Sequence, residues 1–70
     1  MHNNDIIKKL RIALELKDTD ILDIFVKGGA NVTKSEISAF FRKPDHRNYQ
    51  PLGDQLMRKF FNGLTKTYRG

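Results

Sequence analysis

The 70-residue sequence has no cysteine, no tryptophan and no long hydrophobic run. Without cysteine the chain cannot form a disulfide, and its two histidines, His2 and His46, have no thiolate with which to complete a structural zinc site. No apolar run approaches the roughly 18 residues that a membrane span requires. The polar residues 1–5 also lack the apolar segment of a signal peptide. We therefore expect a cytoplasmic protein that binds no metal.

Motifs of catalytic sites are missing as well. The sequence contains no glycine-rich phosphate loop, no paired-histidine helix and no nucleophile elbow. Most carboxylates stand at expected helix starts, where the helix dipole favours an anion. We predict that Asp54 is an N-cap and His46 a surface residue. The sequence thus predicts a non-enzymatic chain without a cofactor, and an enzyme with an unfamiliar site lined by Asp54, His46 and Tyr49 is a less favoured alternative.

The length allows one domain, residues 1–70, with a thin core, because a chain of this size buries only about 60% of its unfolded surface. Apolar side chains recur at helical spacing, without strand-like alternation. We predict an all-α fold, a compact bundle of four short helices, with a fifth helix as the alternative. The expected helices cover residues 5–16, 18–27, 54–67 and the segment between a cap at Thr33 and a stop at Pro44.

The first helix has more apolar surface than one neighbour can cover. Asn4 is the expected cap at its start. Its main apolar stripe combines Ile6, Ile7, Leu10, Ala13 and Leu14. Ile12 and Leu16 fall on another face, where we predict an exposed apolar patch that a second helix or a partner covers.

The central pair of helices resembles a helix-turn-helix. Five apolar residues cover more than half of the second helix and predict that it is mostly buried: Ile21, Leu22, Ile24, Phe25 and Val26. Thr33 and Glu36 form a capping box at the start of the third helix, with Val32 and Ile37 as its hydrophobic staple. The exposed face of a recognition helix would comprise Lys34, Ser35, Ser38, Ala39 and Arg42. The connection over residues 28–32 is longer than the tight turn of that motif, and the same small side chains could instead pack against another helix.

The fourth helix is amphipathic. Leu56, Met57, Phe60, Phe61 and Leu64 form its expected buried stripe, and Arg58, Lys59, Asn62 and Lys66 lie on the opposite face. Gly63 is unfavourable inside a helix by roughly 1 kcal/mol relative to alanine. We interpret it as a point of close approach to another helix; the alternative is that the helix ends there.

The net charge of +5 comes entirely from residues 41–70, because residues 1–40 carry six basic and six acidic side chains. In the polar segment 42–49, four cationic or titratable side chains surround Tyr49, a combination that suits phosphate contact and stacking. The alternative is an ordered loop in which Tyr49 packs on the core and the cations are only solvated.

Three blocks of sequence resemble the YehS-type bacterial domain, a family of unknown function. They are residues 3–14, the run Phe41–Tyr49, and the ending from Gly53 to Leu64 with its Phe60-Phe61-Asn62-Gly63. The resemblance implies a helical fold in a cytoplasmic bacterial protein and supplies no catalytic residues. It also implies two such domains in tandem, of which this chain resembles the second.

Two functions follow as hypotheses. The first is association with nucleic acid through the basic half of the chain and the third helix. Its candidate contact residues are Lys34, Ser35, Ser38, Arg42, Lys43, Arg47, Tyr49, Arg58, Lys59 and Lys66. The second is a protein-interaction or self-association domain that pairs with another copy, in tandem or as a homodimer, through Ile12 and Leu16. One continuous positive face would favour the first, and scattered cations the second.

Overall fold

The structure, a computed structural model, describes residues 2–69. Four helices follow one another: α1 (Asn3–Ala13), α2 (Asp18–Lys27), α3 (Lys34–Phe40) and α4 (Asp54–Arg69). No strand occurs within these residues, so the all-α prediction is confirmed, with four helices in the described part of the chain. None of these helices combines the length and apolar character needed to cross a bilayer.

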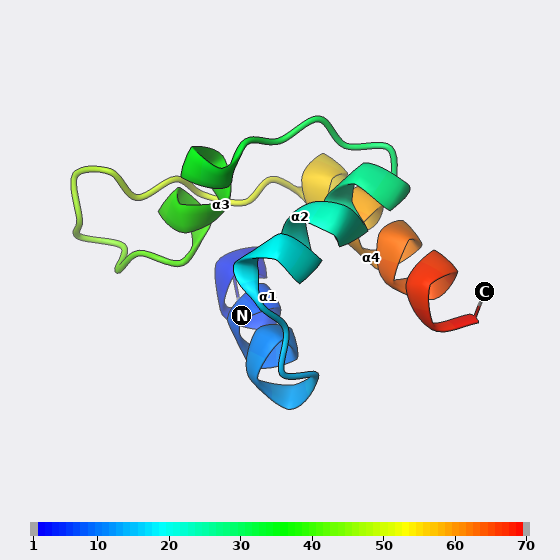
Figure 1. Ribbon diagram of the computed structural model, residues 1–70. Helices are drawn as coiled ribbons and strands as arrows, with labels where there is room; N and C mark the ends of the chain where they lie inside the picture. Colours follow the sequence, from blue (N-terminus) through cyan, green and yellow to red (C-terminus); the bar gives the residue numbers. More distant parts are fainter. Residues whose placement is uncertain (1, 70) are drawn as a thin grey trace.

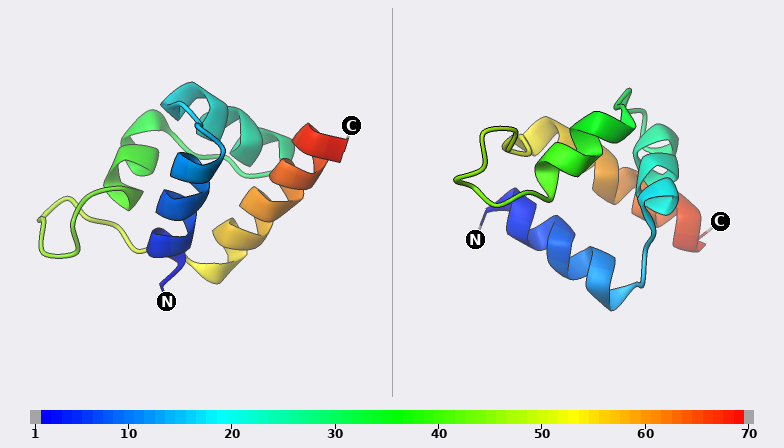
Figure 2. Two further views of the ribbon diagram at one scale, coloured as in Figure 1. Left: turned by 90° about the horizontal axis from the view of Figure 1, so that it is seen from below. Right: turned by 60° about the vertical axis from the view of Figure 1, so that its left-hand side comes forward.

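Helices α2 and α4 pack across one another, and α3 and α1 lie beside them (Figures 1 and 2). Phe25 of α2 is at the centre of the core. Its ring centroid lies 5.0 Å from that of Phe60 in α4 and 6.3 Å from that of Phe40 in α3. All three rings are fully buried, so the phenylalanines join three helices into one core. The long segment between α3 and α4 extends from one end of the molecule (Figure 1).

Two glycines allow the close crossing of α2 and α4. A Cβ built on Gly63 would lie 1.8 Å from the carbonyl oxygen of Ile24, and one on Gly28 would lie 1.7 Å from that of Lys59. Only glycine leaves room for backbone at these distances. The interpretation of Gly63 as a point of close approach is therefore confirmed, and α4 continues through it to Arg69.

Helix α1 starts and ends earlier than predicted. His2 occupies the N-cap position, and Asn4 is buried inside the first turn, so the prediction that Asn4 caps the helix is wrong. At the other end Glu15 has a φ of 53°, and the amides of Glu15 and Leu16 donate to the carbonyls of Ile12 and Arg11. This is a Schellman motif with glutamate at the position that glycine usually occupies.

The turn at Glu15 reverses the expected exposure of several apolar side chains. It directs Leu16 into the core, where the residue is only 9% exposed, so the prediction that Leu16 belongs to an exposed patch is wrong. Ile12 is 77% exposed, as predicted. Ala13 and Leu14 were expected on the buried stripe but are exposed, because the contribution of α1 to the core ends at Leu10.

Helix α3 begins as predicted and ends sooner. Thr33 Oγ1 accepts from the Glu36 amide (3.2 Å), Glu36 Oε1 accepts from the Thr33 amide (3.0 Å), and the staple residues Val32 and Ile37 are buried. The last helical residue is Phe40 rather than Lys43. The helix stops there because its final carbonyls bond outside the helix, to the segment that follows and to α1.

Helix α4 begins at Asp54, and the carbonyl of Gly53 accepts the first helical bond, from the Met57 amide. Asp54 is therefore the first helical residue and not the predicted N-cap. Phe61 and Val26 were expected to be buried but are 44% and 58% exposed. Phe61 follows Phe60 and Val26 follows Phe25, and these two preceding residues face the α2–α4 contact. No helix in residues 2–69 covers the sides of α2 and α4 on which Val26 and Phe61 lie.

Candidate interaction surfaces

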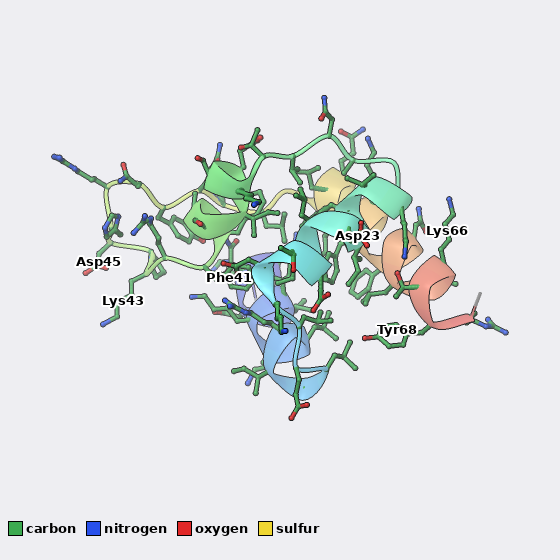
Figure 3. All side chains as sticks on the ribbon, viewed as in Figure 1. Asp23, Phe41, Lys43, Asp45, Lys66 and Tyr68 are labelled. Carbon is green, nitrogen blue, oxygen red and sulfur yellow. The ribbon has the colours of Figure 1, made fainter. Side chains whose placement is uncertain are left out.

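The ten predicted contact residues divide into two groups. We call the first the α3 surface; it combines exposed or half-buried residues of α3 and of the segment that follows: Lys34, Ser35, Ser38, Arg42, Lys43, Arg47 and Tyr49. We call the second the α4 face, which consists of Arg58, Lys59 and Lys66. Figure 3 shows Lys43 and Lys66 at opposite ends of the molecule, so these cations do not gather in one site.

The α3 surface unites two features that the sequence presented separately. A cavity of about 330 Å³ is lined by Ser35 and Ser38 of the helix and by Arg42 and Asn48 of the segment after it. Ala39, which we expected on the exposed face, is buried and forms part of the lining. Two hydroxyls, a guanidinium and an amide thus face one hollow.

Asn4 holds the segment after α3 in place. Its side-chain Nδ2 donates to the carbonyls of Phe40 and Gln50 (both 3.0 Å), and its Oδ1 accepts from the Leu52 amide (2.9 Å). The Gln50 amide also donates to the carbonyl of Ala39 (3.2 Å). These bonds fix both ends of the segment, which makes the polar stretch between them an ordered loop.

Two successive turns shape the outer part of this loop. The amide of His46 donates to the Lys43 carbonyl, and that of Tyr49 donates to the His46 carbonyl (both 2.9 Å). His46 Nδ1 accepts from the Asn48 amide at 3.0 Å. His46 is exposed, as predicted, and stabilises the turn beside the cavity. Tyr49 is half-buried, which agrees with the alternative in which its ring packs on the protein.

The cations of the loop are exposed together with one carboxylate. Arg42, Lys43 and Arg47 face solvent, and Asp45 lies near Lys43 (Figure 3). Phosphate oxygens accept hydrogen bonds from guanidinium, ammonium, hydroxyl and amide groups, all of which this surface offers. The α3 surface can therefore bind a row of phosphate groups through charge and hydrogen bonds alone.

One residue of the α4 face, Lys66, also stabilises the fold. Lys66 Nζ donates to the carbonyl of Lys27, the last residue of α2 (3.1 Å). A cation at the carboxyl end of a helix is favourable because it offsets the helix dipole. Lys59 is half-buried and only Arg58 and Lys66 are well exposed.

A second hollow, of about 390 Å³, lies beside the carboxyl end of α1 and was not predicted from sequence. It is lined by Lys8, Arg11, Ile12, Glu15, Leu16 and Phe41. Arg11 makes two contacts there, with its Nη2 3.1 Å from Asp18 Oδ1 and its Nε donating to the Leu16 carbonyl at 3.3 Å. Its guanidinium lies 5.1 Å from the centre of the Phe41 ring. No group of three or more histidine, cysteine or acidic side chains in residues 2–69 could ligate a metal.

Comparison with known proteins decides the family. A model described as "Protein of unknown function (DUF1456)" matches residues 3–70. The chain belongs to the DUF1456 family. It is 47% identical over 64 residues to the uncharacterized protein YehS of Escherichia coli (strain K12), an alignment that covers 91% of this chain and 41% of YehS. The DUF1456 chain thus spans less than half the length of this relative, and no solved structure matches it.

Membership confirms the resemblance that the three sequence blocks indicated. The DUF1456 family brings no assigned activity, so it transfers no functional residues to the α3 surface or to the hollow beside α1. The tandem arrangement implied by the resemblance stays a prediction. The function of this DUF1456 domain must therefore be inferred from its own geometry.

Proposed function

We propose that the chain is a non-enzymatic, cytoplasmic binding domain that associates with nucleic acid through the α3 surface. The observation that carries this proposal is the shared cavity, where helix hydroxyls and loop side chains converge. By the criterion given above, the separation of Lys43 from Lys66 favours self-association over one continuous binding face. The proposal is therefore narrower than the sequence hypothesis: it rests on the α3 surface alone and leaves out the α4 face.

The chemistry of the α3 surface suits a phosphate backbone. Ser35, Ser38 and Asn48 provide neutral donors around the cavity, and Arg42 provides a charged, planar one. Small hydroxyl side chains allow close approach of a bulky ligand, while the guanidinium supplies most of the attraction. Contacts of this kind position a nucleic acid and carry little sequence information.

The loop adds positive charge beside the cavity, where the phosphate backbone of a nucleic acid would continue. Lys43 and Arg47 are exposed on the ordered loop, whose two ends Asn4 fixes by hydrogen bonds. Because the loop is already ordered in the free protein, binding would not have to order it first. The expected mode is electrostatic and depends on the shape of the duplex rather than on its sequence.

Salt dependence tests this proposal. Three phosphate contacts, from Arg42, Lys43 and Arg47, predict a slope of log K against log salt of about −2.7, or about a 40-fold loss of affinity between 50 and 200 mM salt. The measurement is fluorescence anisotropy of a labelled DNA duplex. We expect the R42A/K43A/R47A variant to lose most of both the affinity and the slope.

The α4 helix provides a matched control. The R58A/K66A/R69A variant removes the same number of positive charges from exposed positions of α4. We expect it to keep most of the affinity, because none of the three residues lines the cavity. Equal losses in the two variants would mean that only net charge matters, and absent salt-sensitive binding in the parent chain would refute the proposal.

A further inference from the structure

The carboxyl end of α1 presents apolar surface that residues 2–69 leave uncovered. Ile12 is 77% and Leu14 39% exposed, whereas the buried residues of the helix, Asn4 and Ile7, both lie in its first half. Figure 1 and the right-hand view of Figure 2 show this end of α1 as a protruding corner. An isoleucine this exposed stabilises nothing within the described chain, so its burial is available to an association.

The hollow beside Ile12 is shaped to receive an apolar side chain. Leu16 and the Phe41 ring supply apolar lining, and Arg11 forms a wall that is fixed by its bonds to Asp18 and to the Leu16 carbonyl. The Arg11 charge is compensated by the Asp18 carboxylate. These two contacts place Arg11 beside the hollow and leave no unpaired charge on it.

We infer that this hollow receives Ile12 from a second copy of the chain, in a two-fold pair with antiparallel α1 helices. Ile12 projects from the same face that carries the hollow. When two copies of this face meet, the Ile12 side chain of each copy can enter the hollow of the other. A two-fold axis makes both insertions at once. The partner is thus an identical surface, and the contact closes as a dimer.

The charges around the hollow select the antiparallel arrangement. Lys8 and Glu15 both line the hollow, seven positions apart in the sequence, and Ile12 lies between them in the chain. A two-fold axis near Ile12 brings Lys8 of each copy to Glu15 of the other. A parallel arrangement would bring like charges together, which is unfavourable. The Lys8 ammonium donates to the Arg42 carbonyl at 3.5 Å, which leaves it two further donors for a carboxylate.

Sedimentation equilibrium of the 70-residue chain, without nucleic acid, tests the pair. We expect a concentration-dependent dimer that the I12E variant abolishes, since each new carboxylate would lose its water against Leu16 and the Phe41 ring, and Arg11 is already paired with Asp18. Ile12 is so exposed that this substitution should leave the helical circular dichroism unchanged. V26E is the matched control, because Val26 is 58% exposed on α2 and does not line the hollow; it should dimerise as the parent chain does.

Charge reversal tests the orientation. K8E and E15K should each weaken the dimer, by roughly tenfold because two ion pairs are lost, and the K8E/E15K double variant should restore it. Rescue of this kind cannot come from a merely structural effect of either residue. A parent chain that stays monomeric up to about 1 mM, a dimer that survives I12E, or a double variant no better than the single ones would overturn the inference. None of these outcomes depends on binding to nucleic acid.

Discussion

Asn4 joins three segments that are remote in the sequence: α1, the end of α3, and the approach to α4. Its amide and carbonyl groups make three hydrogen bonds to backbone atoms of Phe40, Gln50 and Leu52. The side chain is buried, so water cannot replace these partners. One residue therefore fixes the position of the loop that carries most of the cations of the α3 surface.

Replacing Asn4 should destabilise the domain far more than replacing an exposed asparagine. We expect the N4A variant to lose about 3 kcal/mol, because buried backbone groups are left without partners. N62A changes an exposed asparagine of α4 and should lose less than about 0.5 kcal/mol. Urea unfolding followed by circular dichroism measures both. Equal stability of the two variants would contradict the role assigned to Asn4.

The prediction that Asn4 is an N-cap was wrong for a physical reason. An asparagine just before an apolar stripe is typical of an N-cap, and that was the prediction for Asn4. Its actual partners lie 36 to 48 positions away in the chain, so no nearby residue could indicate them. Glu15 was missed similarly, because a left-handed helix end usually carries glycine and here carries glutamate.

At the scale of helices, the α2–α4 crossing depends on Gly28 and Gly63, each of which meets a carbonyl of the opposite segment. Removing this close approach would separate the helices and disturb the Phe25–Phe60 contact behind it. Alanine would otherwise favour the α4 helix by roughly 1 kcal/mol. If Gly63 is what allows the crossing, the steric conflict of an alanine there with the Ile24 carbonyl must cost more than this gain in helix stability.

We therefore expect G63A to destabilise the domain by about 3 kcal/mol, in the range typical of overpacked interiors. Thermal unfolding measures the change. The control is G53A, since a Cβ there would meet no atom within 4 Å. It should cost at most about 1 kcal/mol, from the less favourable residue at the N-cap. A G63A variant as stable as the parent would refute the close packing of α2 on α4.

Elements with local signals were predictable, and elements defined by their neighbours were not. The capping box of Thr33 and Glu36 lies within four consecutive residues and placed the start of α3 correctly. Exposure of Val26 and Phe61 could not be foreseen, because apolar spacing shows which residues could be buried but not how many neighbours exist to bury them.

For the whole molecule, the charge asymmetry could be read from the sequence, but its placement could not. The last thirty residues carry the excess of basic side chains, and whether these form one face or are scattered was left open; Lys43 and Lys66 lie at opposite ends. Conversely, Ser38 and Asn48 belonged to separate predicted features and line one cavity. Both outcomes follow from the folding of the loop back onto α3, which the Asn4 and Gln50 hydrogen bonds produce.

The same placement separates the two surfaces for which different partners are proposed. Phe41 lines the apolar hollow beside α1, and the next residue, Arg42, lines the polar cavity of the α3 surface. The proposed dimer and the proposed nucleic-acid contact would therefore adjoin without sharing these side chains. Each can be removed by substitution while the other is measured.

An amide NMR titration of the ¹⁵N-labelled chain with a short DNA duplex at low salt would locate the proposed binding of nucleic acid residue by residue. Binding at the α3 surface predicts the largest shift changes at residues 34–49 and little change over 58–69. Largest changes along α4, or no changes at low salt, would contradict it.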